Sequence, residues 1–370
     1  MAGGGGASAR KELVRAVGLC MLWYLGSMMN SIFSKSAMKV FPRPITVTMA
    51  QLLMVNICLP FFLPSKMPRL SRKDWTSWVI PLTVLKIVVS LSSQISILKV
   101  PVAYAHTVKG MMPIFTVFLS KVFLNQHHPL LAYISLIPII SGVVIASVTE
   151  LQFDLLGLIS ALVATFTFAI QNIFSKKVMK KGVHHISILL LVSQSAFVAL
   201  LPYWLWNEGT DILFGDTFTS LGDQAFVVLY EMALCGLCSA IQTIAAFTFL
   251  SYVTPVTYSV ANVAKRIVII VASMLFFQNP ATPANIAGIA ISICGIALYN
   301  KSKLDERRRT QMQQQLAMDE AKWGGGGGGG GVMNGYNGAH HQQQQQPSFF
   351  ANQHYTSGGK RKPFGPLHVV

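Results

Sequence analysis

The stretch VTPVTYSVANVAKRIVIIVASMLFF, residues 253–277, decides the fold of this chain. Its length and apolar composition are typical of a helix that crosses a membrane, yet Lys265 and Arg266 lie side by side near its middle. A cation at the centre of a membrane helix costs roughly 2.5–3.5 kcal/mol even on lenient insertion scales. Two adjacent cations at this depth therefore need a specific reason.

The composition of the whole chain is that of a membrane protein. Apolar residues make up 52% of the 370 residues and charged residues only 11%, whereas soluble domains carry about 25% charged residues. The net charge is +16, but the cations cluster between apolar runs and near the C-terminus instead of forming one continuous face. This pattern predicts membrane lipid as a partner and excludes nucleic acid.

Ten apolar runs are long enough to cross the hydrocarbon core, which takes about 20 helical residues. The runs do not alternate as the strands of a membrane β-barrel would. The fold class we predict is an all-α membrane protein with ten transmembrane helices. The predicted spans are 13–33, 43–63, 75–97, 101–123, 130–148, 155–175, 186–206, 225–250, 254–277 and 281–300.

The distribution of Lys and Arg between the spans predicts the orientation. Seventeen of these residues fall on the side that both termini share and four on the other side, where the longest loop, 207–223, is acidic. By the positive-inside rule both termini are cytosolic. The N-terminus resembles a signal peptide but lacks a clear cleavage site, so we expect a retained first helix.

The two halves of the chain resemble each other. NSIFSK at 30–35 recurs as NIFSKK at 172–177, and VPVAYAHTVK at 100–109 is similar to TPVTYSVANVAK at 254–265. Because each half has five helices, an odd number, the second copy must lie inverted in the membrane. Inverted repeats are a transporter architecture with the substrate site near the midplane.

The predicted domain organisation follows from this repeat. A short N-terminal cytosolic segment, 1–12, precedes a first five-helix repeat at 13–150 and a second at 151–303. Residues 304–370 contain glycine and glutamine runs and too few apolar residues to form a core, so we expect a disordered cytosolic tail.

The polar residues inside the spans predict a binding site near the midplane. Lys109 and Lys265 come from opposite repeats, and at 1.5 Å per residue both reach a depth of roughly 12–17 Å. Neighbouring polar side chains of the third, fourth, eighth and ninth spans complete the set. The candidate substrate-binding residues are Lys109, Lys265, Arg266, Tyr104, His106, Tyr258, Asn262, Lys86 and Gln242.

No Asp or Glu lies in the middle of a span to neutralise these cations. An unpaired buried cation is strongly unfavourable, so an anionic ligand is the economical partner for Lys109, Lys265 and Arg266. Pairing with carbonyls or snorkelling toward the surface explains a single Lys near a helix end, and this alternative stays open for Lys86. The Cys235–Cys238 pair has no second pair beside it, so neither a metal nor a cofactor is expected.

YAHTVK with the following Pro113, and SVANVAKR in the ninth span, resemble the triose-phosphate and nucleotide-sugar transporter family of the drug/metabolite transporter superfamily. The likeness is to the E subfamily of solute carrier family 35 and covers residues 13–303. In this family a helix-4 Lys and a helix-9 Lys–Arg pair hold phosphate, roles that fall here on Lys109, Lys265 and Arg266.

The resemblance implies an antiporter of phosphorylated organic anions, such as sugar phosphates or nucleotide sugars. The counter-substrate would be inorganic phosphate or a nucleoside monophosphate. Plastid members carry a Tyr in helix 8, whereas this sequence has Gln242 and Thr243 there. There is no room for a transit peptide before the first span, so the Golgi or the endoplasmic reticulum is expected instead of a plastid.

Two other classes stay open at this point. A non-transporting membrane scaffold or receptor would need neither the repeat nor the cations. A membrane enzyme could use His106 as a base, but no carboxylate or nucleophile stands at a matching spacing, so the protein is not expected to be an enzyme. A homodimer is left open.

Overall fold

The structure, a computed structural model, describes residues 4–62, 71–124, 128–179, 183, 185–215, 221–252, 255–278 and 282–324. It contains two compact units. The larger unit, Glu12–Lys303, is a helical bundle and holds the candidate site. The smaller unit consists of the residues at the two ends of the chain, Met1–Lys11 and Leu304–Val370.

All regular secondary structure of the described residues is helical. The elements of the first half are α1 (Gly4–Val40), α2 (Pro44–Cys58), η1 (Leu59–Phe62), α3 (Arg72–Asp74), η2 (Trp75–Val79), α4 (Ile80–Lys99), α5 (Val102–Lys109), α6 (Met112–Leu124), α7 (Leu130–Ile134) and α8 (Leu136–Val148). Those of the second half are α9 (Leu155–Met179), α10 (His185–Trp204), η3 (Leu205–Gly209), α11 (Thr210–Leu213), α13 (Gln224–Tyr252), α14 (Pro255–Phe277) and α15 (Pro283–Gly324).

The described helices confirm the prediction of an all-α membrane protein. Nine helical stretches among them are long and apolar enough to cross a membrane. Helix α14 has 23 residues and is likewise long enough. Many large apolar side chains of the bundle face outward, among them Phe118, Val198 and Leu275, as expected for a surface that meets lipid.

The fourth predicted span is broken into α5 and α6. Pro113 has no N–H, and its ring would clash with the carbonyl of residue 109 in a continuous helix. The backbone therefore turns at Gly110 and Met111, with Gly110 N–H bonded to the carbonyls of His106 and Thr107. A Cβ atom at Gly110 would lie 2.7 Å from the backbone carbonyl oxygen of Thr107, too close for a real contact, so glycine suits this turn.

The predicted disordered tail is wrong for residues 304–324, because α15 continues to Gly324. This segment is rich in Leu, Arg, Gln, Met and Ala, which are good helix formers. Extending an existing helix requires no new nucleus, so each added residue gains a hydrogen bond at little cost. The helix ends where the glycine run begins, and residues 325–370 lie outside the described part.

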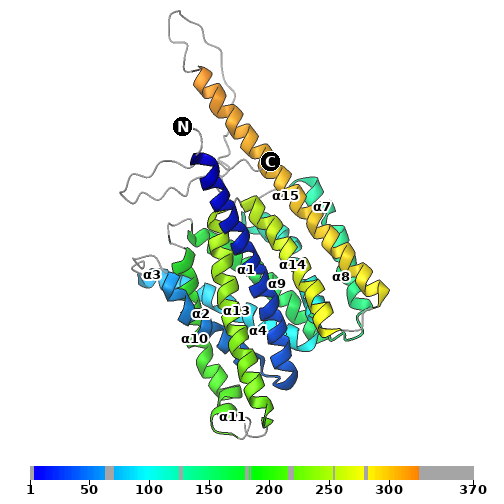
Figure 1. Ribbon diagram of the computed structural model, residues 1–370. Coiled ribbons are helices and arrows are strands. Elements are labelled where there is room, and N and C mark those ends of the chain that lie inside the picture. The colour runs from blue at the N-terminus through cyan, green and yellow to red at the C-terminus, as the bar shows by residue number, and fades with distance from the viewer. Residues whose placement is uncertain are drawn as a thin grey trace, which may run out of the picture. The chain divides into compact units, whose positions relative to one another are not determined.

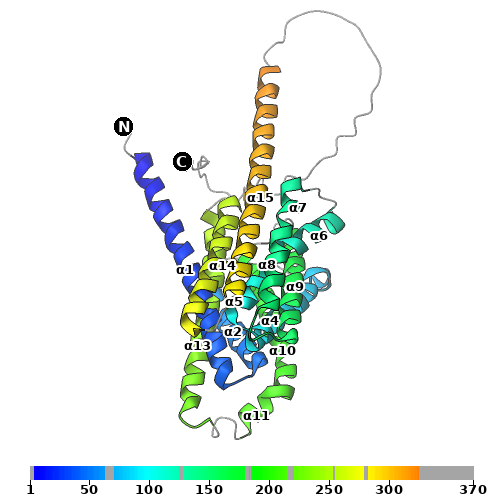
Figure 2. The same cartoon turned by 90° about the vertical axis from the view of Figure 1, so that its right-hand side faces the viewer.

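Some helices that hold equivalent places in the two halves pack against each other. Helix α2 packs against α10 and α5 against α14, whereas α4 packs against α9, which is not its predicted counterpart. Helices α8 and α15 also lie side by side, as both views show (Figures 1 and 2). The division of the chain into two inverted repeats stays a prediction.

Small residues bring α8 and α15 into backbone contact. A Cβ atom at Gly142 would lie closer to the backbone of Ser292 than real Cβ contacts allow, and 2.6 Å from the carbonyl oxygen of Gly288. One at Gly288 would lie 2.6 Å from the backbone nitrogen of Ala146. This close approach is the small-residue packing that joins helices in membranes, where lipid provides no hydrophobic driving force between them.

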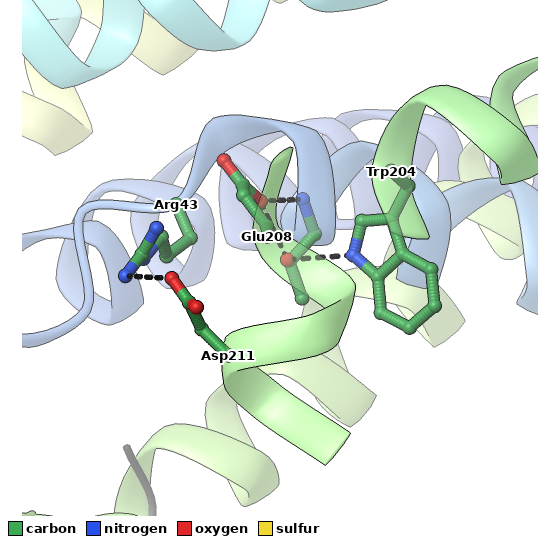
Figure 3. A network of polar contacts seen from close by, with 5 residues as sticks. Arg43, Trp204, Glu208 and Asp211 are labelled. Carbon is green, nitrogen blue, oxygen red and sulfur yellow. Dashed lines mark hydrogen bonds and ion pairs between the residues drawn. The ribbon is translucent and has the colours of Figure 1, made fainter. Parts of the chain in front are cut away.

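The two ends of the bundle differ in their polar contacts. We call the end at which α4 and α14 begin the terminal end, and the end at which α2 and α5 begin the far end. At the far end Glu208 accepts hydrogen bonds from the backbone N–H of Thr46 at 2.7 Å and from its hydroxyl at 2.6 Å (Figure 3). Trp204 donates to the same hydroxyl at 2.9 Å. Thr46 is in the first turn of α2, so Glu208 satisfies an N–H that has no partner within the helix.

Glu208 was expected in an acidic loop at 207–223, but the helix of α10 continues through η3 and α11 to Leu213. This continuation places Glu208 in the protein interior, with 5% of its surface exposed. It also brings Asp211 to within 3.5 Å of Arg43. Glu208 therefore joins α2 to the end of α10 from the protein interior, while the Asp211 side chain, 59% exposed, pairs with Arg43 at the surface.

Lys35 closes the far end from α1. Its ammonium group donates to the carbonyls of Ile97, Leu98 and Val100 at 2.8, 3.0 and 3.1 Å. These are the last carbonyls of α4 and its following residue, which lack partners within the helix. The next residue, Ser36, donates to Glu231 of α13 at 2.5 Å. These contacts join helices α1, α4 and α13 at the far end of the bundle.

Replacing Gly142 by alanine should lower the thermal stability of the protein in detergent, by about 1–3 kcal/mol in unfolding free energy, because the added methyl group meets backbone that cannot rotate away. The matched control is Gly18→Ala in α1, where a Cβ atom would meet nothing within 4 Å. We expect that control to keep or raise the melting temperature, since alanine is the better helix former. Equal melting temperatures of the two variants would contradict the close crossing of α8 and α15.

Candidate functional site

A cavity of about 290 Å³ lies inside the bundle. Its walls come from α1, α2, α4, α5, α6, α9, α13 and α14, and thus from both halves of the chain. A cluster of buried apolar residues that includes Met38, Phe41, Val100 and Met232 adjoins the cavity, because its members Ile97 and Ile269 also line the cavity wall. The cavity therefore sits where the two halves meet, the place at which transporters of inverted-repeat type bind substrate.

Four cationic side chains line the cavity, and no Asp or Glu is among the described residues of its wall. The cations are Lys86 of α4, Lys109 of α5, and Lys265 and Arg266 of α14. The ion pairs of the described part, Arg43–Asp211 and Lys99–Asp154, belong to the far end instead. The positive charge of the cavity is thus uncompensated by protein carboxylates.

Three of these cations are in contact with uncharged groups, which provide no counter-charge. Lys109 donates to the hydroxyl of Ser93 at 2.6 Å, and the ammonium of Lys265 lies 4.6 Å from the centre of the Trp23 ring. A guanidinium nitrogen of Arg266 is 3.6 Å from the sulfur of Met112, a weak acceptor, and its other terminal nitrogen is buried without a hydrogen-bond partner. Hydroxyl, ring and thioether groups orient the cations but do not neutralise them.

The break between α5 and α6 shapes this part of the wall. Lys109 is the last residue of α5, and Met112 is the first of α6. Because Pro113 interrupts the helical ladder, Lys109 sits beside a turn in the middle of the bundle. Helix α14 packs against α5 and brings Lys265 and Arg266 to the same cavity.

A chain of polar side chains forms another part of the wall. Ser34 donates to the side-chain oxygen of Gln94 at 2.5 Å, Gln94 donates to Gln51 at 3.0 Å, and Gln51 donates to Asn30 at 3.0 Å. The chain links α1, α4 and α2, and the thiol of Cys235 joins it from α13. Fixed amide groups of this kind offer donors and acceptors to a hydroxylated ligand.

Sequence analysis missed most of this polar wall. Asn30, Ser31 and Gln51 were not predicted as site residues, although each is a polar residue within an apolar span. A polar residue within an apolar span is a signal of a possible site, but many Ser and Thr residues elsewhere in the spans show it too. Only the packing of α1 and α2 around the cavity distinguishes these three.

Six of the nine predicted site residues line the cavity: Lys86, Lys109, Lys265, Arg266, His106 and Gln242. The ring nitrogen Nε2 of His106 lies 3.2 Å from the hydroxyl of Ser31, so this histidine contacts both α1 and the cavity. Whether these residues bind substrate stays a prediction.

The other three predicted residues are not brought to the cavity wall. Tyr104 is fully buried and donates to Ser147 of α8 at 2.7 Å. Residues two apart on a helix point in nearly opposite directions, so Tyr104 cannot share the face of His106. Asn262 is half-buried one turn before Lys265 but does not line the cavity. The side chain of Tyr258 lies outside the described part.

The fold and the cavity define an integral membrane protein with a cationic chamber between two helical halves. The sequence model of the Triose-phosphate Transporter family matches residues 14–300. The chain belongs to this family. It is therefore a membrane transporter and not an enzyme.

Relatives of this chain include plant phosphate translocators. It is 32% identical to the Phosphoenolpyruvate/phosphate translocator 1, chloroplastic, of Oryza sativa subsp. japonica, over 81% of this chain and 74% of that protein. It is also 32% identical to the Triose phosphate/phosphate translocator, non-green plastid, chloroplastic, of Brassica oleracea var. botrytis, over 81% and 76%. A Schizosaccharomyces pombe protein named as a transporter is 33% identical over 77% of this chain and 66% of that protein.

Replacing Lys109, Lys265 or Arg266 by alanine should weaken the binding of inorganic phosphate at least about tenfold, because each removes a charge-assisted hydrogen bond to the anion. The empty variants should unfold at the same or a higher temperature than the wild type, since a desolvated unpaired charge has been removed. Phosphate binding to purified protein in detergent, and its melting temperature, check both statements.

The control for this series is Lys121→Ala, which removes an exposed lysine of α6 that does not line the cavity. It should bind phosphate as the wild type does. Unimpaired phosphate binding in all three cavity variants would remove the anion-site hypothesis.

Proposed function

We propose that this protein is an antiporter that exchanges phosphorylated organic anions for inorganic phosphate across an endomembrane by alternating access. The observation that carries the proposal is the cavity wall, in which the described residues provide four cations and no carboxylate. Membership of the Triose-phosphate Transporter family, and relatives named as exchanging phosphorylated compounds with phosphate, support it.

A phosphate group supplies the charge that the cavity lacks. At neutral pH a phosphate monoester carries about 1.5 to 2 negative charges and three acceptor oxygens. The planar fork of Arg266 can bind two of those oxygens, while Lys109 and Lys265 act as compact point charges. The unpartnered guanidinium nitrogen of Arg266 is a donor that such a ligand would satisfy.

The organic part of the substrate would meet the polar wall formed by Asn30, Gln51 and Gln94, with Gln242 and Thr243 contributing from α13. A cavity of about 290 Å³ lies at the lower limit of the ~300–1,000 Å³ found for drug-sized ligands. This size favours a small sugar phosphate or phosphorylated acid. A nucleotide sugar, exchanged for a nucleoside monophosphate, is the second candidate, and it would require the chamber to widen.

The closure of the far end supports alternating access. Lys35, Glu208 and Glu231 hold helices together there, and the apolar cluster around Phe41 adjoins the cavity. Rocking of one half against the other would have to break these contacts and form others at the terminal end. They are therefore the bonds whose making and breaking would accompany transport.

The panel experiment that tests the substrate class uses purified full-length protein in liposomes. The vesicles are loaded with inorganic phosphate, with one of several sugar phosphates, with a nucleoside monophosphate or with buffer alone. Uptake of labelled phosphate, sugar phosphate or nucleotide sugar is then measured. Absence of counter-flow with every phosphorylated solute would contradict the proposal and favour a non-transporting scaffold or receptor.

Transport should be obligate exchange. The transition through the occluded state with an empty cavity seals Lys109, Lys265 and Arg266 in a low-dielectric interior, at several kcal/mol per uncompensated ion. Even ~5 kcal/mol slows that step more than a thousandfold, at 1.36 kcal/mol per tenfold. Preloading vesicles with phosphate should therefore accelerate the initial uptake of labelled phosphate by orders of magnitude. Equal initial rates of uptake into empty and preloaded vesicles would show that uncompensated charge does not slow the conformational change of the empty protein.

The proposed orientation has both termini in the cytosol and the protein in the Golgi or the endoplasmic reticulum. The relatives named as chloroplastic make a plastid the alternative location. Asn300-Lys301-Ser302 is a glycosylation sequence at the end of the bundle shared with both termini, where the modifying enzyme would not reach it.

In cells, a tag at the C-terminus should co-sediment with Golgi or endoplasmic reticulum markers and be digested by protease added to sealed organelles. Asn300 should carry no glycan, so that Asn300→Gln leaves the electrophoretic mobility unchanged. A glycan on Asn300, or a tag that is digested only after detergent is added, would reverse the orientation. Sedimentation with a plastid marker would instead assign the protein to the plastid.

A further inference from the structure

Lys86 is a fourth cation of the cavity, and the phosphate site described above does not use it. It lies on α4 in a stripe with Ser90, Ser93 and Gln94, all of which line the cavity. Val84, two positions before it, points to the opposite side of the helix, with 54% of its surface exposed. Lys86 therefore belongs to the inner face of α4 and not to the face toward lipid.

The position of Lys86 along α4 separates it from the other three cations. Lys109 donates to Ser93, which marks where α4 approaches the phosphate site. Seven residues separate Lys86 from Ser93, so their backbone positions differ by about 10 Å along the helix axis. One phosphate group cannot occupy both places, although the flexible four-carbon stem of lysine shortens the gap.

Nothing in the described wall neutralises Lys86. The described part of the cavity has no Asp or Glu, and the ion pairs found in that part of the chain involve Arg43 and Lys99 instead. A cation facing a chamber that must close around its cargo carries the same desolvation cost as the cations of the phosphate site. A substrate with a single phosphate group would provide no negative charge to offset the desolvation cost of Lys86.

We propose that Lys86 binds a second acidic group of the substrate, so that the protein prefers phosphorylated anions carrying a carboxylate or a second phosphate. This inference rests on the proposed exchange of phosphorylated anions and narrows its substrate class. The phosphate binds at Lys109, Lys265 and Arg266, and the second acidic group points along α4 toward the terminal end. Lys86 then determines specificity and is not needed for phosphate itself.

Counter-flow into phosphate-loaded proteoliposomes tests this with matched pairs of probes. The first pair is 3-phosphoglycerate and dihydroxyacetone phosphate, which share three carbons and one phosphate but differ in the carboxylate. The second pair is fructose 1,6-bisphosphate and fructose 6-phosphate, which differ in the second phosphate. The wild type should prefer the more acidic member of at least one pair, and the pair concerned identifies the second group.

Lys86→Gln should reduce uptake of the preferred acidic probe about tenfold or more, which is the effect of losing one charge-assisted hydrogen bond. Exchange of phosphate for phosphate, measured in the same vesicles, should fall by a clearly smaller factor than uptake of the acidic probe. Lys86→Arg keeps the charge and should keep the preference, which guards against a variant that merely folds poorly. The control Lys121→Gln removes an exposed lysine outside the cavity and should behave as the wild type.

Three outcomes would overturn the inference. One is a wild type that exchanges phosphate but shows no preference within either pair. Another is a Lys86→Gln variant that retains the preference. The third is a Lys86→Gln variant that loses phosphate exchange together with the acidic probe, while Lys86→Arg restores both, because Lys86 would then belong to the phosphate site. A wild-type protein that does not exchange phosphate would overturn the proposed function as well. This result differs from the three outcomes above, in which the wild type does exchange phosphate.

Discussion

Positive charge without protein counter-charge, enclosed between two helical halves, is the constraint on which the rest of this structure depends. Lys86, Lys109, Lys265 and Arg266 line one cavity, and its described wall contains no carboxylate. The free energy of such a chamber is lowered by whatever anion enters it. Under the proposed alternating access, binding and conformational change would be linked, because closing an empty chamber would enclose these cations without a counter-charge.

The acidic residues of the bundle are used elsewhere. Glu208 holds the first turn of α2, Glu231 accepts from Ser36, and Asp211 and Asp154 pair with Arg43 and Lys99. All of these contacts lie at the far end, so these carboxylates hold helices together there, and the cations of the cavity are left to the proposed anionic ligand. This separation keeps the cavity wall cationic although the far end contains several carboxylates.

Backbone features of the chain position the charges. Pro113 and Gly110 break the fourth span next to Lys109, and the glycines of α8 and α15 let these helices approach until their backbones touch. Large side chains at the same places would hold the helices apart. Polar residues of α1 and α2 then complete a wall that no single helix could provide.

The sequence by itself determined the all-helical membrane fold, the number and approximate limits of the long helices, and the cations of the cavity. Hydrophobic length and the rarity of charge in lipid are local properties, and Lys109, Lys265 and Arg266 stand out because they violate them.

Only the tertiary structure decided which polar residues face the cavity. Tyr104 points away from it and Gln51 toward it, although both lie in apolar spans, because facing is set by how helices pack and not by composition. The same holds for Glu208. The sequence predicts it in a loop, whereas in the structure the helix continues past the end of α10 and brings the Glu208 carboxylate to the N–H of Thr46 in the first turn of α2. Contacts between residues more than a hundred positions apart depend on the crossing of helices, which the local pattern of a sequence does not specify.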